Sequence, residues 1–177
     1  VYISPDSRYK LHVYCQRVEQ CDLKTGELLY TYKNCKDAGC VSFSQNGRYC
    51  GFEIDSVNHQ IKVIDLEKHI LVYEKSGGEH NQFNIQFINN EKFVYLEFFI
   101  DPKYIKSLFK SDCSTSLHVV DLSNCKEHEL FALPHLGASL DGIFEIHPAY
   151  NNKIYIEMYA YPNHNKEFKK SEMYKLK

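Results

Sequence analysis

The segment Val18–Tyr32, VEQCDLKTGELLYTY, consists of two apolar stretches on either side of a polar Lys-Thr-Gly-Glu turn. Short runs of apolar, β-branched and aromatic residues, bounded by Gly and polar residues, predict two strands joined by a turn. The same order of strand, Asp-Leu, turn and strand returns in IKVIDLEKHILVYEK from Ile61 and in LHVVDLSNCKEHELFAL from Leu117. One hairpin is therefore written three times, which predicts an internal repeat.

The repeat unit is larger than this hairpin. The Asp-Leu pairs mark its period, and a degraded fourth copy follows them: Asp22-Leu23, Asp65-Leu66, Asp121-Leu122 and Lys175-Leu176. Upstream of each pair, an apolar strand end leads through a tight turn into a longer alternating strand, beginning at Ile3, Phe43, Phe87 and Ile146. Asn46-Gly47 is the strongest of these turn signals, because both residues tolerate the positive φ of a two-residue hairpin turn. Each unit thus contains four strands, here named a to d in chain order.

A repeated four-stranded unit of about 40–45 residues is typical of a β-propeller blade. We therefore expect an all-β fold, a β-propeller of four-stranded antiparallel blades, with about four blades at residues 1–34, 35–76, 77–134 and 135–177. Strands such as FVYLEFFI are apolar on both faces, as expected where each blade packs between two neighbours. Because the fourth unit ends after its third strand, we favour a segment of a larger propeller or multidomain protein over a closed four-bladed ring. A β-sandwich is the alternative fold.

The second unit resembles a blade of the WD-repeat β-propellers. Phe43–Gly47, FSQNG, is similar to that family's Phe-Ser-Pro-Asp-Gly turn, and Ile64-Asp65 stands where the family has Trp-Asp. In the first unit, Cys21–Glu27, CDLKTGE, ends in Thr-Gly-Glu and is similar to the turn that leads into the fourth strand of that family's blades. The chain departs from the family at the Trp position, which holds Cys21, Ile64, Val120 and Tyr174. The resemblance implies a propeller without the family's buried Asp-His-Ser-Trp network, and a fold alone does not give a function.

Composition argues against several classes of partner. The net charge is −2, which gives no overall attraction to nucleic acid or anionic membrane. No apolar run approaches the ~20 residues that a transmembrane helix requires. We therefore expect no nucleic-acid and no membrane partner. The seven cysteines are odd in number and form no Cys-x-x-Cys pair, which favours a reducing, cytoplasmic compartment.

No motif in the sequence indicates catalysis or metal binding. The nine histidines show no spacing suited to zinc ligation. Gly137–Asp141, GASLD, lacks the second Gly of a nucleophile elbow, and Gly77-Gly78 is not followed by the Lys and Ser or Thr of a phosphate loop. We expect no catalytic residues, no metal and no cofactor.

Three glutamates form a possible acidic ladder. Aligning the b strands on their turns places Glu53, Glu97 and Glu157 at equivalent positions, where the first unit has Val13. A charge inside an apolar strand is costly unless it is paired. The ladder would bind a cation or a basic peptide, but pairing of each glutamate within the fold is the favoured interpretation.

The third unit carries an insertion between strands b and c. Asp101-Pro102 is a typical helix start, and we expect a short amphipathic helix at residues 101–112. Its apolar face would hold the residues spaced as one side of a helix: Tyr104, Ile105, Leu108 and Phe109. A helix of about two turns is unstable alone, so this face must dock on something. It docks either on its own blade, which we favour, or on a protein partner, with the aromatic residues as anchors.

The function favoured by these observations is a non-enzymatic scaffold for protein–protein interaction, with rim loops of the propeller as the binding surface. One alternative is the non-catalytic propeller of a larger enzyme, such as a peptidase of the prolyl oligopeptidase type. Another is a propeller that binds a small ligand or a cation through the glutamate ladder.

Overall fold

The structure is a computed structural model. It describes residues 1–54, 59–78, 81–100, 113–134, 143–149, 153–160 and 168–175, and it describes side chains within residues 1–130. The predicted helix at 101–112 lies outside these ranges. Within the described ranges the chain forms fifteen strands and no helix.

The strands form four antiparallel sheets in which chain neighbours are also spatial neighbours. We call these sheets blades 1 to 4. Blade 1 contains β1 (Tyr2–Ile3), β2 (Tyr9–Val13), β3 (Arg17–Asp22) and β4 (Leu28–Lys33). Blade 2 contains β5 (Ala38–Phe43), β6 (Tyr49–Ile54), β7 (Gln60–Asp65) and β8 (Ile70–Ser76). Blade 3 contains β9 (Asn81–Phe87), β10 (Lys92–Ile100), β11 (Cys113–Asp121) and β12 (Lys126–Pro134). Blade 4 contains β13 (Ile143–Ala149), β14 (Lys153–Ala160) and β15 (Phe168–Lys175).

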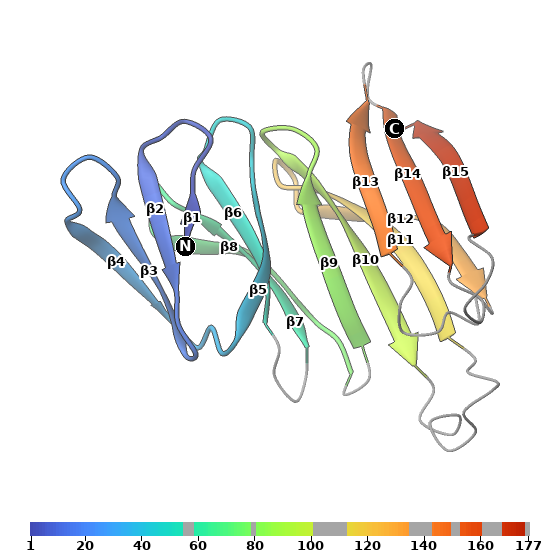
Figure 1. Ribbon diagram of the computed structural model, residues 1–177, viewed down its shortest axis with the longest axis horizontal. Coiled ribbons are helices and arrows are strands. Elements are labelled where there is room, and N and C mark those ends of the chain that lie inside the picture. The colour runs from blue at the N-terminus through green and yellow to red at the C-terminus, as the bar shows by residue number, and fades with distance from the viewer. Residues whose placement is uncertain are drawn as a thin grey trace.

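Figure 1 shows the four sheets side by side along the long axis of the molecule, in chain order from blade 1 to blade 4. Blade 2 packs against blade 1 on one face and against blade 3 on the other. Strands β4 and β8 are the last strands of their sheets, so each leaves one edge unpaired within its own sheet.

The aspartate of each Asp-Leu pair builds the turn between the third and fourth strands of its blade. The Oδ1 atom of Asp22 accepts hydrogen bonds from the backbone N–H groups of Lys24 and Thr25, at 2.9 and 2.7 Å. Asp65 accepts in the same way from the backbone N–H groups two and three residues later, at 3.0 and 3.1 Å. Asp121 accepts from the N–H of Ser123 at 2.9 Å. An Asp side chain favours such turns because it can replace a backbone acceptor.

The leucine of each pair fastens this turn to the turn between the first two strands. The backbone N–H of Leu66 donates to the carbonyl of Arg48 at 2.8 Å. Leu23 and Leu122 make the equivalent bonds to the preceding turns of their own blades, at 2.9 and 2.8 Å. The repeated Asp-Leu is therefore a structural element of the blade.

The hydrophobic core is divided between the blade interfaces. Blades 1 and 2 bury one cluster: Leu11, Val18, Tyr32, Cys35, Cys50, Phe52, Ile54, Ile64 and Leu66. Blades 2 and 3 bury a second: Ile61, Val63, Phe83, Ile85, Phe87, Phe93, Tyr95 and Val120. A fully buried side chain of this size contributes roughly 1.5–3 kcal/mol. Blades 1, 2 and 3 thus bury their apolar faces against a neighbouring blade.

Gly51 allows blades 2 and 3 to approach each other. A Cβ atom at this position would lie 2.5 Å from the Cδ1 atom of Ile85, which is closer than van der Waals contact. The aromatic rings of Tyr49 and Phe87 stack across the same interface, with centroids 6.5 Å apart. The missing side chain therefore creates the space that Ile85 occupies.

Candidate interaction groove

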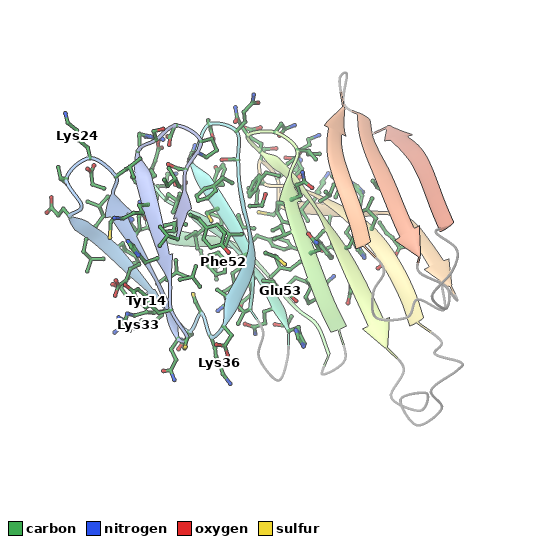
Figure 2. All side chains as sticks on the ribbon, in the orientation of Figure 1. Tyr14, Lys24, Lys33, Lys36, Phe52 and Glu53 are labelled. Atoms are coloured by element: carbon green, nitrogen blue, oxygen red, sulfur yellow. The ribbon has the colours of Figure 1, made fainter. Side chains whose placement is uncertain are left out.

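A groove of about 420 Å³ opens between the outer strands of blades 1 and 2. On the side of blade 1 it is lined by consecutive residues of β4, namely Tyr30, Thr31, Tyr32 and Lys33. On the side of blade 2 it is lined by residues of β6, β7 and β8 and of the turn before β8: Phe52, Lys62, Ile64, His69 and Leu71. Figure 2 labels Phe52 between the two blades and Lys33 at the end of β4.

Two lining residues of the groove, Tyr32 and His69, contact a buried polar side chain, Gln20, which we call the polar floor. The buried amide of Gln20 donates from Nε2 to the backbone carbonyl of Leu66 at 3.0 Å. Its Oε1 atom accepts from the Tyr32 hydroxyl at 2.7 Å, and His69 Nδ1 lies 3.3 Å from the same oxygen. Burial raises the pKa of Tyr32 well above its ordinary value, so its hydroxyl remains a neutral donor. Because these bonds join both blades, the two walls of the groove are fixed relative to each other.

The tyrosine at the mouth of the groove is also held in place. The Tyr30 ring lies parallel to the His69 imidazole, with centroids 4.9 Å apart and 7° between the planes. It also contacts the ring of Tyr32, at 4.8 Å between centroids. An aromatic side chain fixed in this way loses little conformational entropy when a partner packs on it.

Exposed apolar side chains lie on both walls of the groove, Tyr30 on the wall of blade 1 and Leu71 on the wall of blade 2. Leu28, Leu29 and Tyr30 of β4, and Ile70 and Leu71 of β8, are between 39% and 53% exposed. Exposed apolar side chains that line a pocket are typical of an interaction site, whereas isolated apolar residues are common everywhere. We call these five residues, together with the groove, the blade 1–2 rim.

The charged side chains that line the groove are both lysines. Lys33 is exposed at the end of β4. Lys62 is largely buried, and its Nζ atom lies 3.3 Å from the carbonyl of Asn34 and 3.5 Å from the carboxylate of Glu74. No acidic side chain is among the lining residues of this groove. The blade 1–2 rim is therefore apolar with a positive margin.

The glutamate alignment made from the sequence is wrong for Glu97. Tyr49 and Lys92 are equivalent, because each pairs with the anchor aspartate of its blade, Asp65 or Asp121. Glu53 is four residues after Tyr49, whereas Glu97 is five residues after Lys92. The turn of blade 3 is one residue shorter: Ser44 donates to the carbonyl five residues later, but Ile88 donates to the carbonyl four residues later. Since side chains alternate along a strand, the two glutamates lie on opposite faces of their own sheets.

Glu53 faces blade 3 and bonds to its first strand. Its Oε1 atom accepts from the backbone N–H of Phe83 at 3.1 Å and lies 3.6 Å from His59 Nδ1. Ser42 accepts from the backbone N–H of Phe87 at 2.9 Å. Two side chains of blade 2 therefore satisfy N–H groups on the free edge of β9. Phe52 and Glu53, neighbours on β6, point to opposite sides of the sheet (Figure 2).

Glu97 enters the same interface from the other side. It pairs in register with Phe83 on the face that packs against blade 2, and its carboxylate lies 3.8 Å from His118 Nε2. The side chain of Glu157 lies outside the described residues. The predicted partner-binding residues of the insertion, Tyr104, Ile105, Leu108 and Phe109, also lie outside them, so their role stays a prediction.

A second carboxylate binds several groups across the blade 2–3 interface. Glu127 on β12 accepts from the hydroxyls of Tyr73 and Tyr95 at 2.9 and 2.6 Å and from Lys75 Nζ at 2.9 Å. Burial opposes its ionisation, but these three hydrogen bonds outweigh burial and lower the pKa of Glu127 to about 2. Tyr73 and Lys75 come from β8, so an ionised Glu127 joins the outer strands of the two blades.

Ser116, His118 and Glu127 form a chain of short contacts. Ser116 Oγ lies 2.8 Å from His118 Nε2, and His118 Nδ1 lies 3.1 Å from Glu127 Oε1. The order serine, histidine, carboxylate is that of a nucleophile with its base. The imidazole, however, is 8% exposed and stacks on the Tyr95 ring at 4.6 Å between centroids. Packed in this way between two blades, it contributes to the interface.

The described residues contain neither a metal-binding cluster nor a membrane-spanning helix. No group of three or more His, Cys, Asp or Glu side chains there is arranged to hold a metal ion. Likewise, no helix in that part of the chain is long and apolar enough to cross a membrane.

No protein-family model matches the sequence, and no curated protein matches it. Solved β-propellers match the structure. The WD40 domain of coronin from Toxoplasma gondii aligns over 99% of this chain and 45% of its own, with 9% identity and a TM-score of 0.63. KlAtg21, in complex with the coiled coil of AgAtg16, aligns over 92% and 52%, with 10% identity and a TM-score of 0.59. The acylaminoacyl peptidase of Pyrococcus horikoshii aligns over 86% and 27%, with 17% identity and a TM-score of 0.50.

These similarities confirm the predicted fold. The chain is all-β and has the β-propeller architecture found in WD40 domains and in peptidase propellers. It spans between 27% and 52% of the length of the three proteins. At identities of 9–17%, the similarity concerns the fold alone.

Proposed function

We propose that this chain is a non-enzymatic protein-interaction part of a β-propeller, and that the blade 1–2 rim binds an extended segment of a partner protein. The observation that carries the proposal is a preformed groove with exposed apolar side chains on both walls. Interaction sites combine a buried apolar or aromatic centre with a polar margin. A volume of about 420 Å³ is within the range of roughly 300–1,000 Å³ that is usual for ligand pockets.

The charge of the rim specifies the partner further. Lys33 is exposed at the groove, and no acidic side chain is among the lining residues, which favours a segment that carries carboxylates. The partner segment would place aliphatic or aromatic side chains between the blades and acidic side chains near Lys33. KlAtg21, a propeller of similar fold, forms a complex with a coiled coil, which supports protein binding as a use of this architecture.

A display library of random dodecapeptides tests the proposal. Peptides enriched on the chain should combine apolar residues with Asp or Glu, and their affinities can be measured by fluorescence polarisation. Leu71→Glu should weaken binding at least tenfold, because it places a carboxylate on the apolar wall. Ile3→Glu is the matched control, since Ile3 is an equally exposed aliphatic residue of β1 outside the groove. Enriched peptides that bind the Leu71→Glu variant as tightly as the parent chain would refute the proposal.

A second candidate function is the propeller domain of a larger peptidase. The similarity to the acylaminoacyl peptidase of Pyrococcus horikoshii, of which this chain spans 27%, favours it. The sequence of the full-length gene product distinguishes the interaction propeller from the peptidase propeller. A neighbouring α/β-hydrolase segment with a Gly-x-Ser-x-Gly elbow supports the peptidase, and its absence from the full-length product excludes it.

A further inference from the structure

The groove runs along the open edge of a strand. Its blade 1 wall contains four consecutive residues of β4, from Tyr30 to Lys33, followed by Cys35 just after the strand. Successive side chains of a strand point to opposite faces of the sheet. A groove that lay against one face would be lined by every second residue. Four consecutive lining residues show that the groove touches the strand backbone, as expected where it reaches the edge of β4.

The outer edge of β4 has backbone N–H and C=O groups without a strand partner among the described residues. β4 pairs with β3 on one side, and no other strand pairs with it in the described part of the chain. An unpaired strand edge presents a row of N–H and C=O groups that can template another strand. Because β4 is the outermost strand of blade 1, stacking of the next blade leaves this edge accessible.

The sequence of β4 lacks the protection that such edges usually carry. Charged side chains normally blunt an exposed edge. The outermost strand of blade 3 begins with four polar or charged residues, Lys126–Glu129, all of them exposed. In contrast, β4 reads LLYTYK, and its only charge is Lys33 at the end. Blade packing does not require this apolar edge, since Leu28, Leu29 and Tyr30 remain exposed.

We propose that the partner segment binds by strand addition, as a fifth strand of blade 1 beside β4. This inference rests on the proposed function of the blade 1–2 rim. Main-chain hydrogen bonds to β4 supply affinity, and alternate side chains supply specificity. Side chains on the face of Tyr30 and Tyr32 enter the groove and are apolar. The intervening side chains lie on the face of Thr31 and Lys33, where an acidic residue pairs with the lysine across the strands.

The dimensions of the groove favour a single added strand over a second copy of this chain. A β4–β4 contact between two copies would bring a whole four-stranded sheet to the rim. The space of about 420 Å³ accommodates a few side chains. An isolated segment with alternating apolar and acidic residues fits both this volume and the charge of the rim.

The probe is a fluorescently labelled hexapeptide of alternating Leu and Asp, with both ends blocked. Two further versions carry N-methyl groups on alternate residues, one on the Leu set and one on the Asp set. An added strand directs every second N–H toward β4, so one N-methylated version should bind at least tenfold more weakly and the other should bind almost normally. A hexapeptide of alternating Leu and Lys should bind more weakly than the Leu-Asp probe because of Lys33.

The outcomes separate this inference from the proposed function. If both N-methylated peptides bind like the parent peptide while Leu71→Glu still prevents binding, the groove binds side chains and strand addition is refuted. If the parent peptide does not bind at millimolar concentration, strand addition is also refuted, and the display screen judges the proposed function separately. Concentration-dependent dimerisation in sedimentation velocity that Leu71→Glu abolishes, with no binding of the peptide, would instead identify a second copy as the occupant.

Discussion

Glu53 of blade 2 accepts a hydrogen bond from the backbone N–H of Phe83 in blade 3, with 3.1 Å between Oε1 and N. Phe83 lies on β9, the first strand of its sheet, whose outer edge has no strand partner in the described part of the chain. An unsatisfied N–H in an interface is costly, and here a side chain of the preceding blade satisfies it. The contact gives a carboxylate inside an apolar strand a structural role.

Glu53→Ala should lower the free energy of unfolding by about 1–3 kcal/mol, because the Phe83 N–H loses its acceptor. Glu53→Gln should cost less, since the amide oxygen can accept the same bond. Urea denaturation followed by circular dichroism measures both, with Glu27→Gln on the exposed turn before β4 as the control. If Glu53→Ala and Glu53→Gln lower the free energy of unfolding equally, the negative charge beside His59 is what stabilises the chain, and the hydrogen bond to Phe83 is not.

The pH dependence of stability should depend on Glu127. Its folded-state pKa of about 2 lies below the ordinary value of 4.5, so the ionised carboxylate stabilises the folded chain at neutral pH. This contribution, on the order of 1–3 kcal/mol, should be lost as the pH falls from about 4.5 toward 2. Glu127→Gln should be less stable than the parent at pH 7, and the difference should shrink over this range. Denaturation midpoints at several pH values test this, and an equal difference at pH 7 and pH 2.5 would contradict it.

Gly51→Ala should destabilise the blade 2–3 interface by about 1–3 kcal/mol through overpacking. The new methyl group would lie 2.5 Å from the Cδ1 atom of Ile85. Ile85→Val removes that methyl group, so the double variant should recover part of the loss. Gly39→Ala is a suitable control, because no atom lies within 4 Å of a Cβ at that position. Thermal melts of the parent chain, Gly51→Ala, the double variant and Gly39→Ala measure these effects. Equal losses of stability for Gly51→Ala and Gly39→Ala would contradict the close approach of Ile85 to Gly51.

Gln20→Leu should destabilise the chain and weaken peptide binding at the blade 1–2 rim. The substitution leaves the Tyr32 hydroxyl and the Leu66 carbonyl without their buried partner, at a cost of about 1–3 kcal/mol for each group. Adding Tyr32→Phe should restore part of the stability. Gln16→Leu, on the exposed connection before β3, serves as the control. A Gln20→Leu variant with unchanged peptide affinity would show that the polar floor does not hold the groove open.

Much of the fold follows from the sequence because the repeat is dictated locally. The Asp-Leu turns, the Asn46-Gly47 hairpin and the alternation along each strand use contacts within one unit, which a linear pattern records. The positions where WD-repeat proteins have Trp hold buried packing residues such as Cys21, Ile64 and Val120. The pattern therefore predicts the blade even where it departs from the family.

The candidate site could not be predicted in the same way. The groove forms where two blades diverge, and its walls come from segments about forty residues apart in the chain, near Tyr30 and Leu71. The one local signal was the apolar run LLYTY at the end of the opening segment, in a strand that the repeat places on the outside. The polar floor likewise left no sign in the sequence, because Gln20 contacts Leu66 only after the two blades have packed together.

The shorter first turn of blade 3 has a consequence for how such chains can change over generations. Removing one residue from that turn moves every side chain of the following strand to the other face of the sheet, and so to the other neighbouring blade. Removing two residues returns each side chain to its original face. Odd and even changes in loop length are therefore different kinds of mutation. An odd change is best tolerated where the strand is apolar on both sides, as in FVYLEFFI of β10, the strand that follows the shorter turn.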